Sequence, residues 1–281
     1  MQISNELEVQ SFQFTADKPN MLVRAEEINE LAEIDAYCKN IHESIHCTDD
    51  IWYMEIEEGV MLFEWLFSSK GEGSEDDRRR LQELLSKNTQ IKNTQITDKN
   101  AKPITISLGT YDDLVSDLKT YIDARRDILK GISNPTEFES FMHSCFANSL
   151  FADDILSEMK KIADFSEHTE EIVNNLSVLN DEAIDLYKKY HNNLKKAMDI
   201  LASKLLACSP DPNHLKFLNF KFSYLENING ENVAKYKEIT CSPHLKLINK
   251  GSDLRIYFYW CDKDVGNGEK VLVGRIGSHP Y

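Results

Sequence analysis

Apolar and polar residues alternate through the last quarter of the chain. The alternation runs through HLKFLNFKFSYLE, YKEITC, HLKLI, LRIYFYW and KVLVGRIG, and turns rich in Asn and Gly separate these stretches. A period of two with such turns is typical of antiparallel strands. The turn at residues 265–269, which contains Gly266-Asn267-Gly268, is the strongest hairpin signal in the sequence. The pattern predicts an antiparallel β module over residues 209–281.

A helical period dominates before that module. Residues 181–206 place apolar side chains at alternating steps of three and four, which predicts one helix with a core-facing stripe. Asn180 is the expected N-cap, and Pro210 and Pro212 follow the end. His191 lies on the stripe, so we expect it to be packed in the core. Residues 153–179 predict a second helical region, bent near Ser166.

The first hundred residues mix the two periods. We expect a strand at residues 7–14 and a helix at 26–42, while residues 50–69 fit two strands around Glu57-Glu58-Gly59 or a strand and a helix, with strands preferred. Ser74 is the expected cap of a helix with an acidic first turn. The polar residues 88–102 predict a loop or boundary, and a short strand and a helix at 111–130 follow. The predicted class is α+β: an acidic mixed region (1–100), a mainly helical region (101–208) and the β module (209–281), packed on helices from 153–208.

Composition narrows the functional classes. No stretch approaches the roughly 20 apolar residues that span a bilayer, and the start lacks the pattern of an export signal, so we expect a soluble cytoplasmic protein with no membrane partner. The six scattered cysteines are therefore expected to be reduced thiols. The net charge is −15, but Lys and Arg outnumber Asp and Glu by 10 to 8 after residue 208. The acidic part keeps the protein soluble or binds a basic protein partner, and the mildly basic module is the place for an RNA partner.

One strand of the module carries a chemically suggestive pattern. In LRIYFYW, alternation assigns Leu254, Ile256, Phe258 and Trp260 to the core and places three polar side chains on the other face. Those three are Arg255, Tyr257 and Tyr259; a guanidinium holds phosphate, and phenols stack on bases or donate protons. Cross-strand packing is the alternative role for these aromatics. His244, Lys246, Arg275 and His279 lie on neighbouring segments, and metal-independent RNA cleavage needs a base, a cation beside the phosphate and an acid.

The same segments resemble a known family. Two helices followed by an antiparallel sheet, the run Arg255-Ile256-x-Phe258-x-Trp260, Val271 and Val273 in the last strand, and the tail with His279 and Tyr281 look like the ribosome-dependent RNA-cleaving toxins of the RelE/HigB type. The resemblance covers at most residues 153–281. It implies a toxin or phage-defence protein that acts on RNA or the ribosome as a metal-independent endoribonuclease, without a cofactor. The implied catalytic residues are Arg255, His279, His244, Lys246 and Tyr257, and the implied RNA-binding residues are Tyr259 and Arg275.

Other readings of the sequence remain open. The acidic region also fits a non-enzymatic interaction or regulatory subunit of a defence complex. His42-Glu43-Ser44-Ile45-His46 matches H-E-x-x-H, in which a helix would place both imidazoles on a zinc ion, with Glu43 as base and Glu64 as a third ligand. A structural zinc site on Cys241, His244, Cys261 and His279 is a further alternative. The sequence contains no P-loop, dinucleotide-binding glycine fingerprint or G-x-S-x-G motif.

Overall fold

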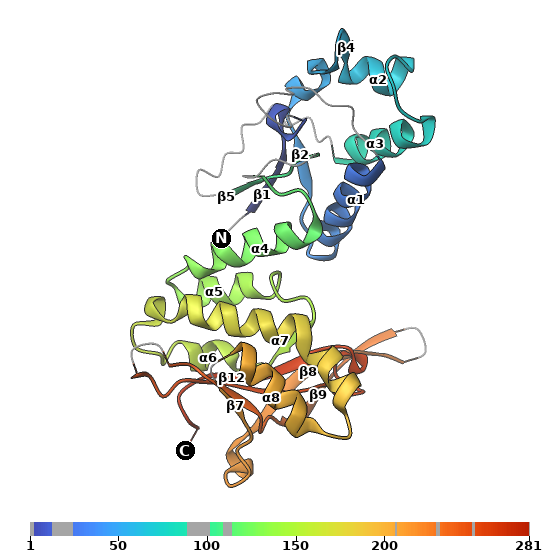
Figure 1. Cartoon of the computed structure of the whole chain (residues 1–281). Helices are drawn as coiled ribbons and strands as arrows, with labels where there is room; N and C mark the ends of the chain where they lie inside the picture. Colours follow the sequence, from blue (N-terminus) through green and yellow to red (C-terminus); the bar gives the residue numbers. More distant parts are fainter. Residues whose placement is uncertain are drawn as a thin grey trace. The chain divides into compact units, whose positions relative to one another are not determined.

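The chain forms two compact units, Met1–Arg125 and Arg126–Tyr281. The structure, a computed structural model, describes residues 3–12, 25–88, 102–108, 114–205, 207–228, 231–248 and 251–280 (Figure 1). The division falls within helix α4 (Leu118–Lys130) and not near residue 100, because strand β5 (Lys102–Thr105) pairs with β1 (Ile3–Leu7) in the first unit. The mixture of helices and sheets confirms the α+β class. Most of the expected loop at 88–102 lies outside the described residues.

The first unit is built on a three-stranded parallel sheet. Strand β1 lies between β2 (Ile45–Cys47) and β5 and runs parallel to both. Helix α1 (Ala25–Asn40) matches the expected helix at 26–42, and its buried residues recur at helical spacing: Ile28, Leu31, Ile34 and Cys38. The strand expected at 7–14 is wrong, since β1 ends at Leu7 and a 3-10 helix, η1 (Val9–Phe12), follows.

The segment after β2 combines both readings of its sequence. A 3-10 helix, η2 (Asp49–Tyr53), leads into β3 (Glu55–Glu57) and β4 (Val60–Met61), which pair around Gly59 at φ +72°; helix α2 (Leu62–Ser68) follows at once. Helix α3 (Glu75–Asn88) begins as expected, because the Asp77 backbone N–H donates to Ser74 Oγ at 3.1 Å.

The helices of the second unit correct three expectations. The stripe at 181–206 is not one helix: α7 (Thr169–Tyr190) and α8 (Leu194–Lys204) are separated by a short break, and Asn193 caps α8. His191 lies at that break and is exposed, so it is not a core histidine. Asn180 lies inside α7 instead of capping it. Its buried Oδ1 accepts hydrogen bonds from the Asn148 backbone N–H (2.9 Å) and Ser149 Oγ (3.0 Å). Upstream lie the shorter helices α5 (Pro135–Met142) and α6 (Ile155–Met159).

The C-terminal sheet is largely antiparallel, as expected. Its order is β6 (Ser149–Phe151), β12 (Val271–Gly277), β11 (Arg255–Tyr259), β10 (His244–Lys246) and β7 (Cys208–Ser209). Only the short edge strand β6 is parallel to its neighbour. The predicted hairpin joins β11 to β12, and Gly266, Asn267 and Gly268 all take positive φ in its turn.

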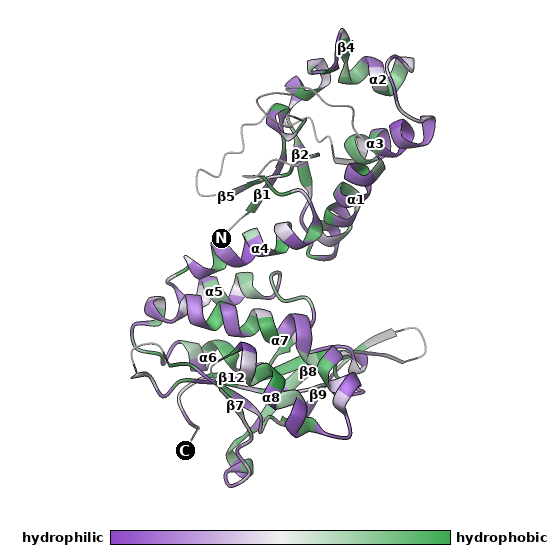
Figure 2. Cartoon of the chain, viewed as in Figure 1, coloured by the Kyte–Doolittle hydropathy of each residue, from purple (hydrophilic) through white to green (hydrophobic). Residues whose placement is uncertain are grey.

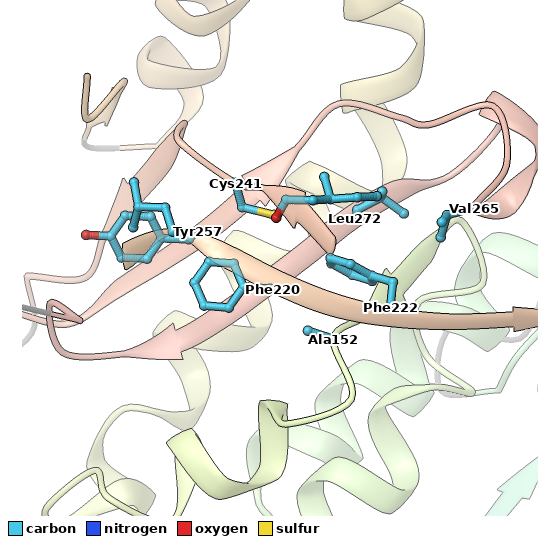
Figure 3. Close-up of a cluster of buried hydrophobic side chains, with 9 residues drawn as sticks. Ala152, Phe220, Phe222, Cys241, Tyr257, Val265 and Leu272 are labelled. Atoms are coloured by element: carbon cyan, nitrogen blue, oxygen red, sulfur yellow. The ribbon is translucent and has the colours of Figure 1, made fainter. Parts of the chain in front are cut away.

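A separate two-stranded hairpin packs on this sheet. Strands β8 (Asn219–Ile228) and β9 (Glu231–Thr240) pair only with each other among the described residues. Their inward side chains join residues of β11 and β12 in one apolar cluster (Figure 3): Ala152, Leu218, Phe220, Phe222, Ile239, Cys241, Tyr257, Val265 and Leu272. Because the hairpin covers this part of the sheet, the side chains beneath it are fully buried.

Candidate functional site

Strand register gathers the candidate residues at one end of the sheet. His244 on β10 lies opposite Tyr257 on β11, and Tyr257 lies opposite Arg275 on β12. Arg255 lies opposite Lys246 on one side and Gly277 on the other. His279 follows β12 by two residues, which returns it towards the Tyr257 position. Residues more than 30 positions apart in sequence thus share one site.

Tyr257 links the two histidines. Its hydroxyl oxygen lies 2.8 Å from Nδ1 of His279, and its ring lies 5.1 Å from the His244 ring, centroid to centroid. The side chain is fully buried against Phe220, with the hydroxyl pointing away from the apolar cluster (Figure 3). Tyr257 therefore does not lie on an exposed face: the β8–β9 hairpin covers its ring, which takes the packing role that was the alternative for these aromatics. The hydroxyl end of its side chain nevertheless contacts His279.

His244 is a buried, neutral imidazole. It is 5% exposed, and its Nε2 lies 3.3 Å from Ser209 Oγ. Burial lowers the pKa of His244 to about 4, and the charge of Arg255 and the neighbouring His279 act in the same direction. The backbone of Ser242 and the Asp211 carboxylate oppose this shift only in part. At neutral pH the His244 ring carries no charge, and it packs against the Tyr257 ring.

His279 is the more accessible of the two imidazoles. It is partly buried, and burial together with the Arg255 charge lowers its pKa below the ordinary value of 6.5. Asp211 and Asp253 raise the pKa to a smaller extent. When Nδ1–H donates to Tyr257, Nε2 keeps its lone pair and faces away from that bond. A neutral imidazole with one nitrogen engaged in this way is suited to accept a proton.

Arg255 supplies the cation of the site. One Nη donates to the Leu254 carbonyl at 2.8 Å, while Nε is buried without a hydrogen-bond partner among the described residues. Arg255 lies two residues before Tyr257 on β11, and its charge lowers the pKa of both His244 and His279. Lys246, opposite on β10, is exposed and adds a second positive charge at this end of the sheet.

Arg275 and Tyr259, the two residues expected to bind RNA, lie in environments different from that of Arg255. Arg275 pairs with Glu158 at 2.6 Å, with side chains 14% and 8% exposed, and its Nε donates to the Ser278 carbonyl at 2.8 Å. This buried pair ties β12 to α6 and leaves little of the guanidinium for a ligand. Tyr259 is 37% exposed on the outer part of β11, where partial burial raises its pKa.

The site contains residues that the sequence pattern did not single out. Asp211 is 8% exposed and lies 3.0 Å from Nδ1 of His214, and both residues influence His279 electrostatically. They come from the turn SPDPNH after β7, where an Asp followed three residues later by a His was the available signal. His214 thereby becomes a third imidazole in the neighbourhood of His279.

The H-E-x-x-H reading is wrong in its geometry. Helix α1 ends at Asn40, His42 has a positive φ of 60°, and His46 lies in strand β2, so the two imidazoles are not one turn apart on a helix. Glu43 instead accepts two hydrogen bonds from buried Arg125, at 2.7 and 2.8 Å. Glu64 lies in α2 and pairs with Lys70.

The alternative zinc site also lacks its ligands. Cys241 is fully buried in the apolar cluster, where burial raises the pKa of its thiol. Among the described residues, no three His, Cys, Asp or Glu side chains gather as metal ligands. All six cysteines are free thiols, and no helix in the described part of the chain is long and apolar enough to cross a membrane.

Comparison of the chain with protein-family models, with curated proteins and with solved structures found no match.

Proposed function

We propose that the second unit is a metal-independent RNA-cleaving module that acts through His279, Arg255 and His214. The observation that supports this most strongly is the meeting of the Tyr257–His279 pair with the Arg255 charge at one end of the sheet. Imidazoles and a guanidinium supply the proton transfers and the phosphate binding that RNA cleavage needs. The resemblance to RelE/HigB toxins points to the same chemistry and shares Arg255 and His279, whereas His214 comes from the structure alone.

The proposed reaction uses the RNA's own 2′-hydroxyl. Nε2 of His279 takes the 2′ proton while the 2′ oxygen bonds to phosphorus, and Arg255 and Lys246 balance the negative charge of the phosphate. The bond from phosphorus to the 5′ oxygen breaks, and His214, as the general acid, gives that oxygen a proton. The products are a 2′,3′-cyclic phosphate and a 5′-hydroxyl end.

Buried residues position this machinery. Tyr257 orients His279 through the 2.8 Å hydrogen bond, and His244 packs against the Tyr257 ring. Neither side chain has the exposure to contact RNA, so we assign both a positioning role. The pair of Arg275 and Glu158 holds the start of the tail that carries His279.

The test uses the intact chain with free RNA and, separately, with mRNA on translating ribosomes. Arg255→Ala and His279→Ala are each expected to slow cleavage by about 10²–10⁴-fold, which is the usual contribution of one proton-transfer or charge-stabilising group. Arg79→Ala and His191→Ala are matched controls, because both residues are exposed and lie outside the site. Equal rates of RNA decay with all four variants and the wild type would refute the proposal.

Tyr257→Phe separates positioning from direct catalysis. The change removes only the Tyr257 hydroxyl that is hydrogen-bonded to His279, and it keeps the buried aromatic ring. We expect slower cleavage and a displaced acid limb of the pH–rate profile, because the hydrogen bond that orients His279 and fixes its tautomer is lost. A reduced rate with an unchanged pH profile would show that the hydroxyl acts only through packing.

A further inference from the structure

The first unit exposes a group of aromatic rings that the proposed RNA site does not use. Trp52 and Tyr53 in η2 and Phe63 and Phe67 in α2 form what we call the aromatic ridge. Tyr53 is 74% exposed, Phe67 59% and Phe63 39%. The rings meet in pairs: Tyr53 and Phe63 have centroids 6.2 Å apart, and Trp52 and Phe67 6.4 Å. Scattered exposed aromatics are common on soluble proteins, but adjoining ones mark interaction surfaces.

The packing of α2 keeps the rings of the aromatic ridge exposed to solvent. Leu62, Trp65 and Leu66 bury the opposite side of α2, so Phe63 and Phe67, four residues apart, share the outer side. The buried Trp65 anchors the helix: its indole N–H donates to the Glu72 carbonyl, and the Arg78 guanidinium lies over its ring at 5.2 Å. The rings are therefore presented from a fixed support.

Negative charge surrounds the ridge in the sequence. Residues 49–77 contain ten Asp and Glu and only one Lys, and that residue, Lys70, already pairs with Glu64. In the described part of the chain, no ion pair forms at four of these acids, all exposed: Asp49, Asp50, Glu55 and Glu58. Figure 2 shows hydrophobic positions in α2 and a hydrophilic stretch between α2 and α3.

We propose that the aromatic ridge binds a cationic segment of another protein that carries large apolar side chains. Aromatic side chains supply most of the binding energy in many interfaces, and they do so at the centre of a polar rim. The unpaired acids lie in or next to η2 and β3, close in sequence to the ridge, and their charge attracts Lys and Arg and repels nucleic acid and anionic lipid. The ridge and these acids thus combine apolar contact with selection for a basic polypeptide, independently of any activity in the second unit.

The experiment measures binding of the full chain to three short fluorescein-labelled peptides by fluorescence anisotropy. The first carries Leu and Lys at helical spacing, the second replaces Lys by Glu, and the third replaces Leu by Ser. We expect the Leu–Lys peptide to bind at least about tenfold more tightly than either of the others, because it alone offers both contacts. Equal binding of the Leu–Lys and Ser–Lys peptides would show a purely electrostatic surface and overturn the proposal.

Single substitutions then locate the site. Phe67→Ser and Tyr53→Ser are each expected to weaken binding of the Leu–Lys peptide about tenfold, as for a central interface aromatic. Tyr236→Ser is the matched control, since Tyr236 on β9 is 64% exposed and lies in the other unit. Circular dichroism confirms that the variants are folded. Unchanged affinity in both ridge variants contradicts the proposal, as does a self-association in sedimentation that Phe67→Ser abolishes, because the occupant would then be a second copy.

Discussion

Lowering the pH from 7.5 to 5 should destabilise the second unit through His244. The folded protein keeps this imidazole neutral, because it is 5% exposed and its pKa is about 4, whereas in the unfolded chain the pKa returns to about 6.5. Between these values the unfolded chain binds more protons. The sign follows: stability is fully present above the unfolded pKa and is lost as the pH falls towards the folded pKa.

The magnitude comes from the size of that shift. At pH 5 the solution is about 1.5 units below the pKa of the unfolded imidazole. Each unit changes the free energy of unfolding by about 1.36 kcal/mol. His244 should therefore cost the folded state about 2 kcal/mol at pH 5 and almost nothing at pH 7.5. His279, whose pKa is also lowered, adds a smaller loss of the same sign.

His244→Gln isolates the contribution. Urea unfolding at both pH values, followed by hydrogen exchange of peptides from β11 and β12, reads the second unit by itself. The pH-dependent loss in wild type should exceed that in His244→Gln by about 2 kcal/mol, and lost packing against Tyr257 cancels because it is present at both pH values. His191→Gln, at an exposed histidine, is the control and should behave like wild type. Equal pH-dependent losses in wild type and His244→Gln would refute the account of a neutral buried imidazole.

Two further stability predictions follow from buried contacts. Arg125→Met should lower the free energy of unfolding of the first unit by about 3–5 kcal/mol, because Glu43 loses a fully buried bidentate partner; a loss below about 1 kcal/mol in urea denaturation would contradict this. Gly274→Ala should cost about 1–3 kcal/mol, because its Cβ would lie 2.4 Å from the Phe220 ring and 2.8 Å from Cys241 Sγ; an unchanged melting temperature would show that the hairpin yields freely.

Local patterns were sufficient for elements whose signals are local. The hairpin turn at Gly266, Asn267 and Gly268 is dictated by residues that accept positive φ, and the cap at Ser74 by a single side chain. The break before Asn193 was missed because the apolar stripe of α8 continues that of α7 nearly in phase. Sequence period alone does not distinguish one long helix from two short ones.

The candidate site could not be predicted from local patterns, because it is formed by contacts between residues that are far apart in the sequence. Alternation in β11 separated the partly exposed Arg255 from the buried Ile256, but the burial of Tyr257 comes from the β8–β9 hairpin, and a bulge after Tyr257 shifts the strand register. Glu43 was assigned to a zinc motif because its partner, Arg125, lies 82 residues away. His214 was missed because only folding brings its turn beside the C-terminal tail.

The central claim is that the second unit cleaves RNA with its own 2′-hydroxyl as nucleophile. The most direct measurement maps the ends formed when the intact chain acts on an mRNA, free or on translating ribosomes, with a matched 2′-deoxy substitution at each mapped position. The account predicts cyclic-phosphate and 5′-hydroxyl ends that disappear at the deoxy position and in His279→Ala. Cleavage that persists at the deoxy position, or is unaffected by His279→Ala, would contradict it.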